Sequence, residues 1–208
     1  MSTRVLSPPE PIVLPSDIPG SHAEDDQMVA AMIAAVTAEI DGPEGWLGRC
    51  IGPQTIEWRV CCWADLCAGI PYPPLIGVDS ISYDDETGAD VEVDQDLWGV
   101  SGKFIWFRSA WSFPCLAAVP EPVKIVFRAG YNDQPLTEDG GTGPIPAQVK
   151  QAVILSVQYL KTLGKDDLFM RVDEVEGVGR REYTVSEQAG TIIRTAADRL
   201  LAGLRQFT

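Results

Sequence analysis

The hydrophobic pattern of this chain changes its period along the sequence, and this restricts the fold more than any other feature. Between residues 54 and 62 apolar and polar side chains alternate, which is typical of a strand with one buried face. Between residues 146 and 164 apolar side chains recur every three or four positions, which is typical of a helix. The sequence therefore predicts an α+β fold, in which an antiparallel β lobe is inserted into a helical bundle.

The β lobe is expected to span residues 54–131. The stretch IGVDSISYDDETGADVEV predicts a hairpin that turns between Asp85 and Gly88. A further hairpin is predicted in LWGVSGKFIWFRSAW, with its turn across Ser101 and Gly102. The last strand is predicted in PVKIVFRAGY, and a long loop rich in glycine and proline follows it. This loop lacks the lysine of a phosphate-binding loop, so we expect it to be a flexible connection.

The first helical region is expected within residues 21–53. Ser21 and Glu24 have the spacing of a capping box, and Asp41-Gly42-Pro43 is expected to end the helix. A second short helix or turn is predicted around Trp46. The apolar side chains of the first helix lie at helical spacing: Met28, Val29, Met32, Ile33, Val36 and Ile40.

The central helix of the bundle is expected at residues 144–164. Pro146 suits the first helical position, and Gly164 suits the position just past the end. One face carries Val149, Val153, Val157 and Leu160. Other faces carry Ile154, Leu155 and Tyr159. Because a helix that is apolar on more than one side contacts more than one neighbour, these three are candidate residues for a subunit interface.

Residues 165–208 are expected to form a C-terminal arm that ends in a docking helix. The segment 165–183 is polar and aperiodic except for Leu168, Phe169 and Met170, which anchor the arm either on a neighbouring subunit or in a local core. Thr184 and Glu187 repeat the capping-box spacing and open the final helix. Its apolar stripe and flanking arginines are Ile193, Arg194, Ala197, Arg199, Leu200, Leu204, Arg205 and Phe207. Two interpretations are open: this helix docks on another protein, or it packs on its own subunit.

Composition limits the partners and the location of the chain. A net charge of −14 argues against sequence-independent binding to DNA, RNA or an anionic membrane, because that binding needs Lys and Arg. The five prolines of residues 1–20 predict an extended arm without internal hydrogen bonds, and this arm is no signal peptide. No stretch reaches the roughly 20 apolar residues that span a bilayer. We therefore expect the protein to stay in the cytoplasm that makes it.

Residues that carry catalytic chemistry are scarce. A Ser-His-Asp or Cys-His arrangement would have to use His22, the single histidine, so we predict no enzyme and no cofactor. The five cysteines include no CxxC pair and are expected to be buried and reduced. Zinc binding by Cys61, Cys62 and Cys67 is disfavoured, since adjacent cysteines on a strand point to opposite faces.

Carboxylates recur at every second position in one stretch: Asp90, Glu92, Asp94 and Asp96. The stretch lacks the glycine and the distal glutamate of an EF-hand loop, which disfavours calcium. The favoured interpretation is an acidic strand face in solvent. If this face lined a channel, it would keep passing DNA from binding to the wall.

The order of these features resembles a known family. A helical N-terminus is followed by PYPPLIGVDSISYDD, VKIVFRAGYND and IPAQVKQAVILSVQYL. Together these stretches resemble bacteriophage head–tail connector proteins, which are adaptor or head-completion proteins of long-tailed phages with relatives in gene transfer agents. The matching positions are Arg128, Gly130, Tyr131, Pro146, Val149, Lys150, Gln151, Ala152, Ala197, Leu200, Leu201, Leu204 and Arg205. The resemblance covers approximately residues 24–207; the proline-rich start and the cysteines depart from it.

The resemblance implies a virion structural protein of the neck, assembled in the host cytoplasm. It implies a dodecameric ring that binds the portal protein on one side and a neck stopper or tail-completion protein on the other. DNA passes through the central channel without specific binding, and no membrane is involved. The implied portal-docking residues are those of the final helix: Ile193, Arg194, Ala197, Arg199, Leu200, Leu201, Leu204, Arg205 and Phe207.

Three alternatives remain open at this point. The first is a monomeric carbohydrate- or peptide-binding module that uses Trp98, Trp106 and Trp111 of the β lobe. The second is a neck stopper or tail-terminator protein. The third is an enzyme that depends on a metal held by the acidic strand.

Overall fold

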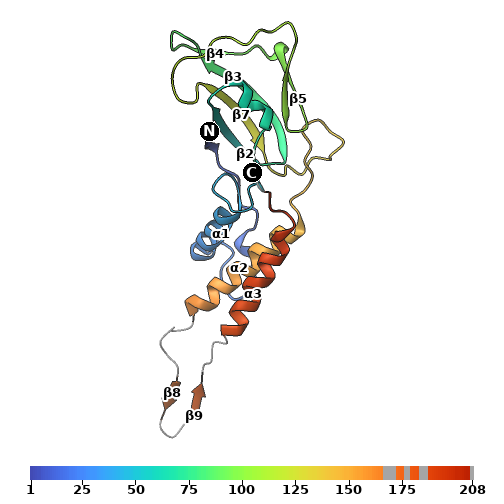
Figure 1. Cartoon of the computed structure of the whole chain (residues 1–208). Coiled ribbons are helices and arrows are strands. Elements are labelled where there is room, and N and C mark those ends of the chain that lie inside the picture. The colour runs from blue at the N-terminus through green and yellow to red at the C-terminus, as the bar shows by residue number, and fades with distance from the viewer. Residues whose placement is uncertain (166–171, 176–178, 183–186, 207–208) are drawn as a thin grey trace. The chain divides into compact units, whose positions relative to one another are not determined.

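The computed structural model describes residues 1–165, 172–175, 179–182 and 187–206, with side chains described to residue 161 and again from residue 195 (Figure 1). The fold is mixed α+β, as predicted. The chain divides into two compact units. The β unit comprises Met1–Glu10, Glu39–Ile145 and Arg205–Thr208, and the helical unit comprises Pro11–Ala38 and Pro146–Leu204.

The β unit is built on a five-stranded antiparallel sheet in the order β1-β2-β7-β3-β4. Its strands are β1 (Ser2–Ser7), β2 (Gln54–Val60), β3 (Leu75–Asp84), β4 (Asp90–Glu92) and β7 (Val123–Ala129). A separate hairpin pairs β5 (Trp98–Ser101) with β6 (Phe104–Phe107). Both predicted hairpins are therefore confirmed, with turns where the glycines at 88 and 102 adopt positive φ.

The period-two pattern places one face of the sheet in the core. Along β2 and β7 every second side chain is buried, and the register sets Ile56 beside Phe127 and Trp58 beside Ile125. Ile81 of β3 continues this buried face. The β5–β6 hairpin adds Trp98 to the same core, and η2 (Trp63–Ala68) adds Leu66. The opposite face of the sheet carries the polar side chains.

The Arg-x-Gly-Tyr sequence at the end of β7 has a structural explanation. The Gly130 amide donates to the Pro74 carbonyl at 2.8 Å, and the Tyr131 amide donates to the Ile51 carbonyl at 2.8 Å. A Cβ atom at Gly130, which has φ of 119°, would lie 2.1 Å from the Gly52 oxygen. Only glycine fits at this point, where β7 passes between two loops.

The start of the chain differs from the expected free arm. Residues 2–7 form β1, which pairs with β2 from Ser2 opposite Arg59 to Ser7 opposite Thr55. The prolines that suggested an arm begin only at Pro8, so the residues before it keep their backbone donors. Ile12, Val13 and Ile18 are also buried in the helical unit.

Residues 41–53 form a compact loop where a second short helix had been an option. The buried Asp41 carboxylate organises it: Oδ1 accepts from the Ile51 amide at 2.6 Å and from Gln54 Nε2 at 2.9 Å. Its Oδ2 accepts from the Gly52 amide at 3.1 Å. Burial raises the pKa of Asp41, while these hydrogen bonds oppose the rise. The loop belongs to the β unit.

The first helix, α1 (Gln27–Ile40), begins later than predicted. Asp26 caps it, because its Oδ1 accepts from the amides of Met28 at 2.9 Å and Val29 at 3.2 Å. The start at Ser21 was therefore wrong. Its buried stripe consists of Val29, Ile33, Val36 and Ile40. Met28 is 70% exposed, so its place in the predicted stripe was wrong, and Met32 is half-buried.

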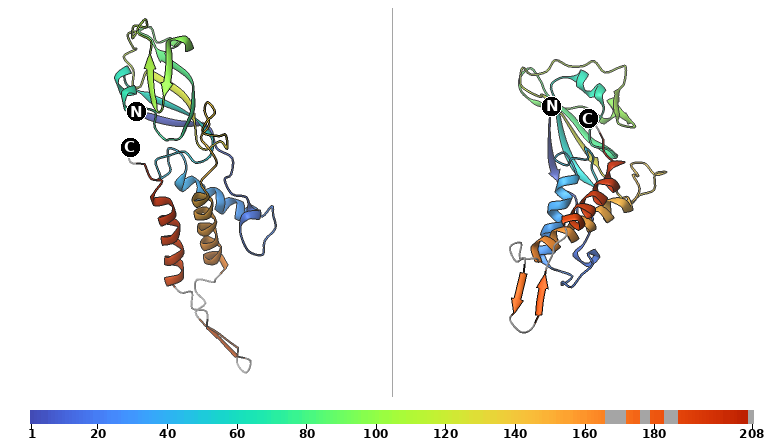
Figure 2. Two further views of the ribbon diagram at one scale, coloured as in Figure 1. Left: turned by 90° about the vertical axis from the view of Figure 1, so that its right-hand side faces the viewer. Right: turned by 60° about the horizontal axis from the view of Figure 1, so that its bottom comes forward.

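The other two helices, α2 (Ala147–Lys165) and α3 (Glu187–Ala202), lie side by side in the helical unit in each view (Figures 1 and 2). α2 includes Gly164 and ends at Lys165, so the prediction that Gly164 lies just past the end of the helix was wrong. Lys161 Nζ lies 2.9 Å from His22 Nδ1, which ties the segment before α1 to α2. Between the helices, β8 (Val172–Val175) pairs with β9 (Gly179–Glu182), where no regular structure had been predicted.

Candidate protein interaction site

The outer faces of α2 carry apolar side chains that the chain does not fully cover. The inner face is formed by Val149, Ala152, Val153 and Val157, all buried. The three predicted interface residues, Ile154, Leu155 and Tyr159, are half-buried. The remaining predicted interface residues, Leu168, Phe169 and Met170, lie outside the described residues. α2 thus packs within its own unit on one side and presents partly open apolar surface on others.

The predicted docking residues of α3 divide into two groups. Ala197 and Leu201 are buried, whereas Leu200 and Leu204 are half-buried and Arg199 is exposed. Ile193, Arg194 and Phe207 have side chains outside the described residues. Ala197 and Leu201 therefore stabilise the fold of this chain, whereas Leu200, Leu204 and Arg199 keep surface that a partner could contact.

The end of the described chain belongs to the β unit rather than to a free arm. Arg205 places its guanidinium carbon 5.8 Å from the centre of the Trp46 ring. The Gln206 amide donates to the Leu47 carbonyl at 2.8 Å. A Cβ atom at Gly48 would lie 2.7 Å from the Gln206 oxygen, so these segments approach closely.

The four acidic residues at period two do not share one strand. Asp90 and Glu92 lie on β4, but Val93 is buried and the strand ends before Asp94. Asp94 instead caps the short helix η3 (Gln95–Leu97), and its Oδ1 accepts from the Asp96 amide at 3.1 Å. The acidic stretch is therefore a strand followed by a turn. Among the described residues no group of three or more potential metal ligands gathers.

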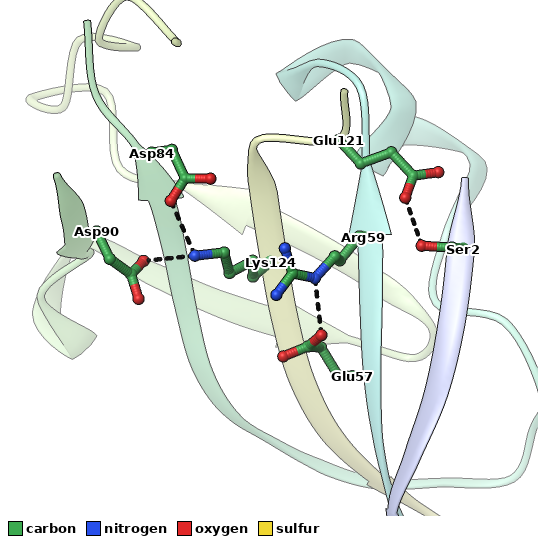
Figure 3. Close-up of polar contacts among 7 residues, drawn as sticks. All are labelled: Ser2, Glu57, Arg59, Asp84, Asp90, Glu121 and Lys124. Carbon is green, nitrogen blue, oxygen red and sulfur yellow. Dashed lines mark hydrogen bonds and ion pairs between the residues drawn. The ribbon is translucent and has the colours of Figure 1, made fainter. Parts of the chain in front are cut away.

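The polar face of the sheet balances its charges locally, as Figure 3 shows. Arg59 of β2 lies opposite Lys124 of β7 in the register. Arg59 Nε binds Glu57 at 2.7 Å, and Lys124 Nζ binds Asp84 at 2.8 Å and Asp90 at 3.2 Å. The hydrogen bond to Asp84 is the main cause of the raised pKa of Lys124. This face is thus already paired.

At one edge of the same face, Ser2 donates a hydrogen bond to Glu121 (Figure 3). The N-terminal ammonium lies 2.6 Å from the other oxygen of Glu121, and its hydrogen bond lowers the pKa of that carboxyl. These contacts fasten β1 to the loop that leads into β7.

The β unit contains an aromatic cluster that the sequence pattern did not reveal. Trp63 of η2 makes edge contacts with Phe107 and Trp111, at centroid distances of 5.9 and 5.1 Å. Trp111 in turn stacks on Phe107 at 4.4 Å. Of the three tryptophans of the alternative binding module, Trp98 is buried in the core, Trp111 is half-buried and Trp106 is exposed. Trp98 is therefore not available to a surface that all three would share.

Beside this cluster lies a cavity of about 340 Å³, which we call the aromatic cavity. η2, β6 and the segment after β6 form its wall, including Trp63, Cys67, Trp106, Arg108, Trp111 and Phe113. Trp106 and Phe113 are 47% and 56% exposed. The ring of Trp106 lies over Gly99, where a Cβ atom would come within 2.3 Å of it. Sequence offered no signal for the cavity, because its walls come from separate segments.

The segment after β7, residues 132–143, is held by many hydrogen bonds, although a flexible connection had been predicted. Asn132 Oδ1 accepts from the Thr142 amide at 3.0 Å, and Thr142 Oγ1 donates to the Gly130 carbonyl at 2.8 Å. Asp133 and Gly143 are joined by a backbone bond of 3.0 Å. This Leu136 loop, as we call it, presents Leu136 with 78% of its surface exposed.

The cysteines also differ from the prediction of buried thiols. Cys50 is buried, and burial raises the pKa of its thiol. The other four, Cys61, Cys62, Cys67 and Cys115, are exposed and free.

None of the helices among the described residues has both the length and the apolar character that a membrane span needs.

Comparisons with known proteins place the fold. No family model and no curated protein matches this sequence. A chain from a structure described as "Virion of native gene transfer agent (GTA) particle" is similar with 15% identity and a TM-score of 0.61. The chain has the fold of that particle protein. The alignment covers 100% of this chain and 97% of the other.

Two further structures give the same result. In "Neck of native GTA particle computed with C12 symmetry" the similar chain has 17% identity and a TM-score of 0.57. In "Neck of empty GTA particle computed with C6 symmetry" it has 16% identity and a TM-score of 0.61. Coverage is again 100% of this chain and 97% of the other in both cases.

Proposed function

We propose that this chain is a structural, non-enzymatic component of a virion neck, where copies of it form a ring between the portal protein and the next neck or tail protein. The likeness of fold to chains of gene transfer agent necks carries this proposal, because it extends over the whole chain and includes both units. The C12 symmetry of one of those necks supports twelve copies in the ring.

The ring needs contacts between neighbouring subunits, and the outer faces of α2 are suited to one of them. Ile154, Leu155 and Tyr159 are half-buried within the chain, so a neighbour would cover the remaining apolar surface. Full burial of such side chains contributes about 1.5–3 kcal/mol each, which is reduced here because they are already partly covered. Contacts this modest become effective only when many copies assemble together.

Docking on the portal is assigned to the accessible side of α3. Ala197 and Leu201 support α3 from inside the chain, so the proposal uses Arg199, Leu200 and Leu204. One copy would bind weakly, and a ring of copies would gain from the high effective concentration of its linked helices.

DNA would pass through the centre of the ring without specific binding. The net charge of −14 supports this, since the protein repels phosphate as a whole. The exposed acidic side chains at 90, 92, 94 and 96 would contribute where they face the channel. If replacing them with lysine left DNA passage unchanged, this part of the proposal would be rejected.

The proposal is tested by negative-stain imaging of the full chain, alone and mixed with the purified portal protein of its particle. We expect an additional annular layer on the portal. The variant Arg199→Glu should reduce the layer, and Arg4→Glu, at an exposed position of β1 with the same change of charge, is the control for charge alone. A chain that stays monomeric with and without portal protein would contradict the proposal.

A further inference from the structure

Exposed aromatic side chains line and border the aromatic cavity. Trp106 and Phe113 of its wall are substantially exposed, and so is Phe104, which shares a face of β6 with Trp106. Exposed aromatic side chains around a hollow are typical of protein contact sites, since they bury large area at little cost in conformational entropy. An apolar side chain of another protein surface would therefore fit into this cavity.

The Leu136 loop supplies a side chain of that kind in a fixed conformation. Besides the bonds of Asn132 and Thr142, the Glu138 amide donates to the Pro135 carbonyl and the Gly141 amide donates to the Glu138 carbonyl, both at 3.0 Å. These bonds hold the loop in one conformation before any contact, which lowers the entropy cost of association. Nothing in its own unit covers Leu136, the most exposed of the large apolar side chains described.

The charges around the two features are complementary. Arg108 lines the cavity, and Lys103, whose Nζ lies 5.5 Å from the Phe104 ring centre, stands on the same hairpin. Beside Leu136, the exposed Glu138 and Asp139 make the loop acidic. In a chain with a net charge of −14, a basic spot that meets an acidic loop opposes the general repulsion between copies.

The cavity wall and the Leu136 loop come from separate segments of the β unit. In the left view of Figure 2 the teal η2 segment and the yellow loop before α2 lie apart from each other. A projection and a hollow at separate places on one molecule produce a head-to-tail contact between copies, and such contacts close into rings when the rotation allows it.

We propose that Leu136 of one copy enters the aromatic cavity of the next copy, with Glu138 and Asp139 facing Arg108. This contact deepens the proposed ring and rests on it. It adds a second point of attachment between subunits, located in the β units, to the one assigned to α2.

Cysteine cross-linking of the full chain tests this contact, because Cys67 lines the cavity and is exposed. The variant Leu136→Cys is prepared with the other exposed cysteines replaced by serine, bound to the portal protein and oxidised with copper phenanthroline. A disulfide forms only where the two Cβ atoms approach to about 3.5–4.5 Å. Peptide mapping of the oligomers should identify an intermolecular 136–67 disulfide. Val119→Cys, another exposed apolar position of the β unit, is the matched control.

A second variant measures the contribution of the contact without cross-linking. Leu136→Asp should weaken association about tenfold or more, because it places a carboxylate in an apolar cavity, and urea unfolding should be unchanged. An annular layer on the portal without a 136–67 disulfide above the Val119→Cys level would overturn this inference and leave the proposed function standing. If neither the annular layer nor the disulfide formed, both this contact and the proposed function would be overturned.

Discussion

The buried carboxylate of Asp41 permits a prediction with a magnitude. The variant Asp41→Ala removes the acceptor of three hydrogen bonds, from the amides of Ile51 and Gly52 and from Gln54. A buried donor left without a partner costs about 1–3 kcal/mol, and loss of the buried charge returns part of this. We therefore expect Asp41→Ala to lower the free energy of unfolding by about 3–5 kcal/mol.

The variant Asp41→Asn separates the charge from the hydrogen bonds. An amide keeps one acceptor oxygen and turns a donor toward the third partner, so we expect a loss of about 1–3 kcal/mol at neutral pH. Because burial raises the pKa of Asp41, the folded state holds the proton more tightly than the unfolded state does. The wild type should therefore gain stability relative to Asp41→Asn as the pH falls from 7 toward 4.

Urea unfolding followed by tryptophan fluorescence measures both effects. All six tryptophans lie in the β unit, so the signal reports the unfolding of the unit that contains Asp41. Glu44→Ala, an exposed acidic position in the same loop, is the matched control. A loss below about 0.5 kcal/mol for Asp41→Ala, within the range of ordinary surface substitutions, would refute the reasoning.

Two further predictions concern single contacts. Lys124→Met should lower the free energy of unfolding by about 1–3 kcal/mol at pH 7, through loss of its bonds to Asp84 and Asp90. Since the pKa of Lys124 is raised in the fold, the stabilisation by its ion pairs is complete below pH about 10.4 and is lost as the pH rises through the raised value. A Lys124→Met variant as stable as the wild type at pH 7 would contradict the pairing of Lys124 with Asp84 and Asp90. Asp26→Ala should cost about 1 kcal/mol through loss of the α1 cap, measured by urea unfolding followed by far-UV circular dichroism, and an Asp25→Ala variant that costs as much would show that Asp26 is not the cap.

The sequence predicted the parts of the fold in which burial repeats regularly. β2 and β7 bury every second side chain, so their positions followed from the alternation alone. β1 was missed because it lies at the sheet edge, where most of its side chains are exposed and leave no pattern. The start of α1 was misplaced because Ser21 and Asp26 both offer a capping oxygen, and the local pattern does not show which is used.

The candidate contact surfaces were less predictable for a different reason. The half-buried positions of α2 followed from its apolar residues on several faces, although whether a subunit covers them stays a prediction. The aromatic cavity depends on η2 meeting β6, which are separated by many residues in sequence. The order of the Leu136 loop depends on Thr142 reaching back to Gly130, which composition rich in glycine does not reveal.

The central claim is that copies of this chain form a closed ring in a neck, and a cryo-EM reconstruction of the purified particle's head–tail junction tests it most directly. We predict a ring of density next to the portal protein into which the β unit and the helical unit of this chain both fit, once per subunit. A junction resolved at side-chain detail in which no ring contains this fold would contradict the claim.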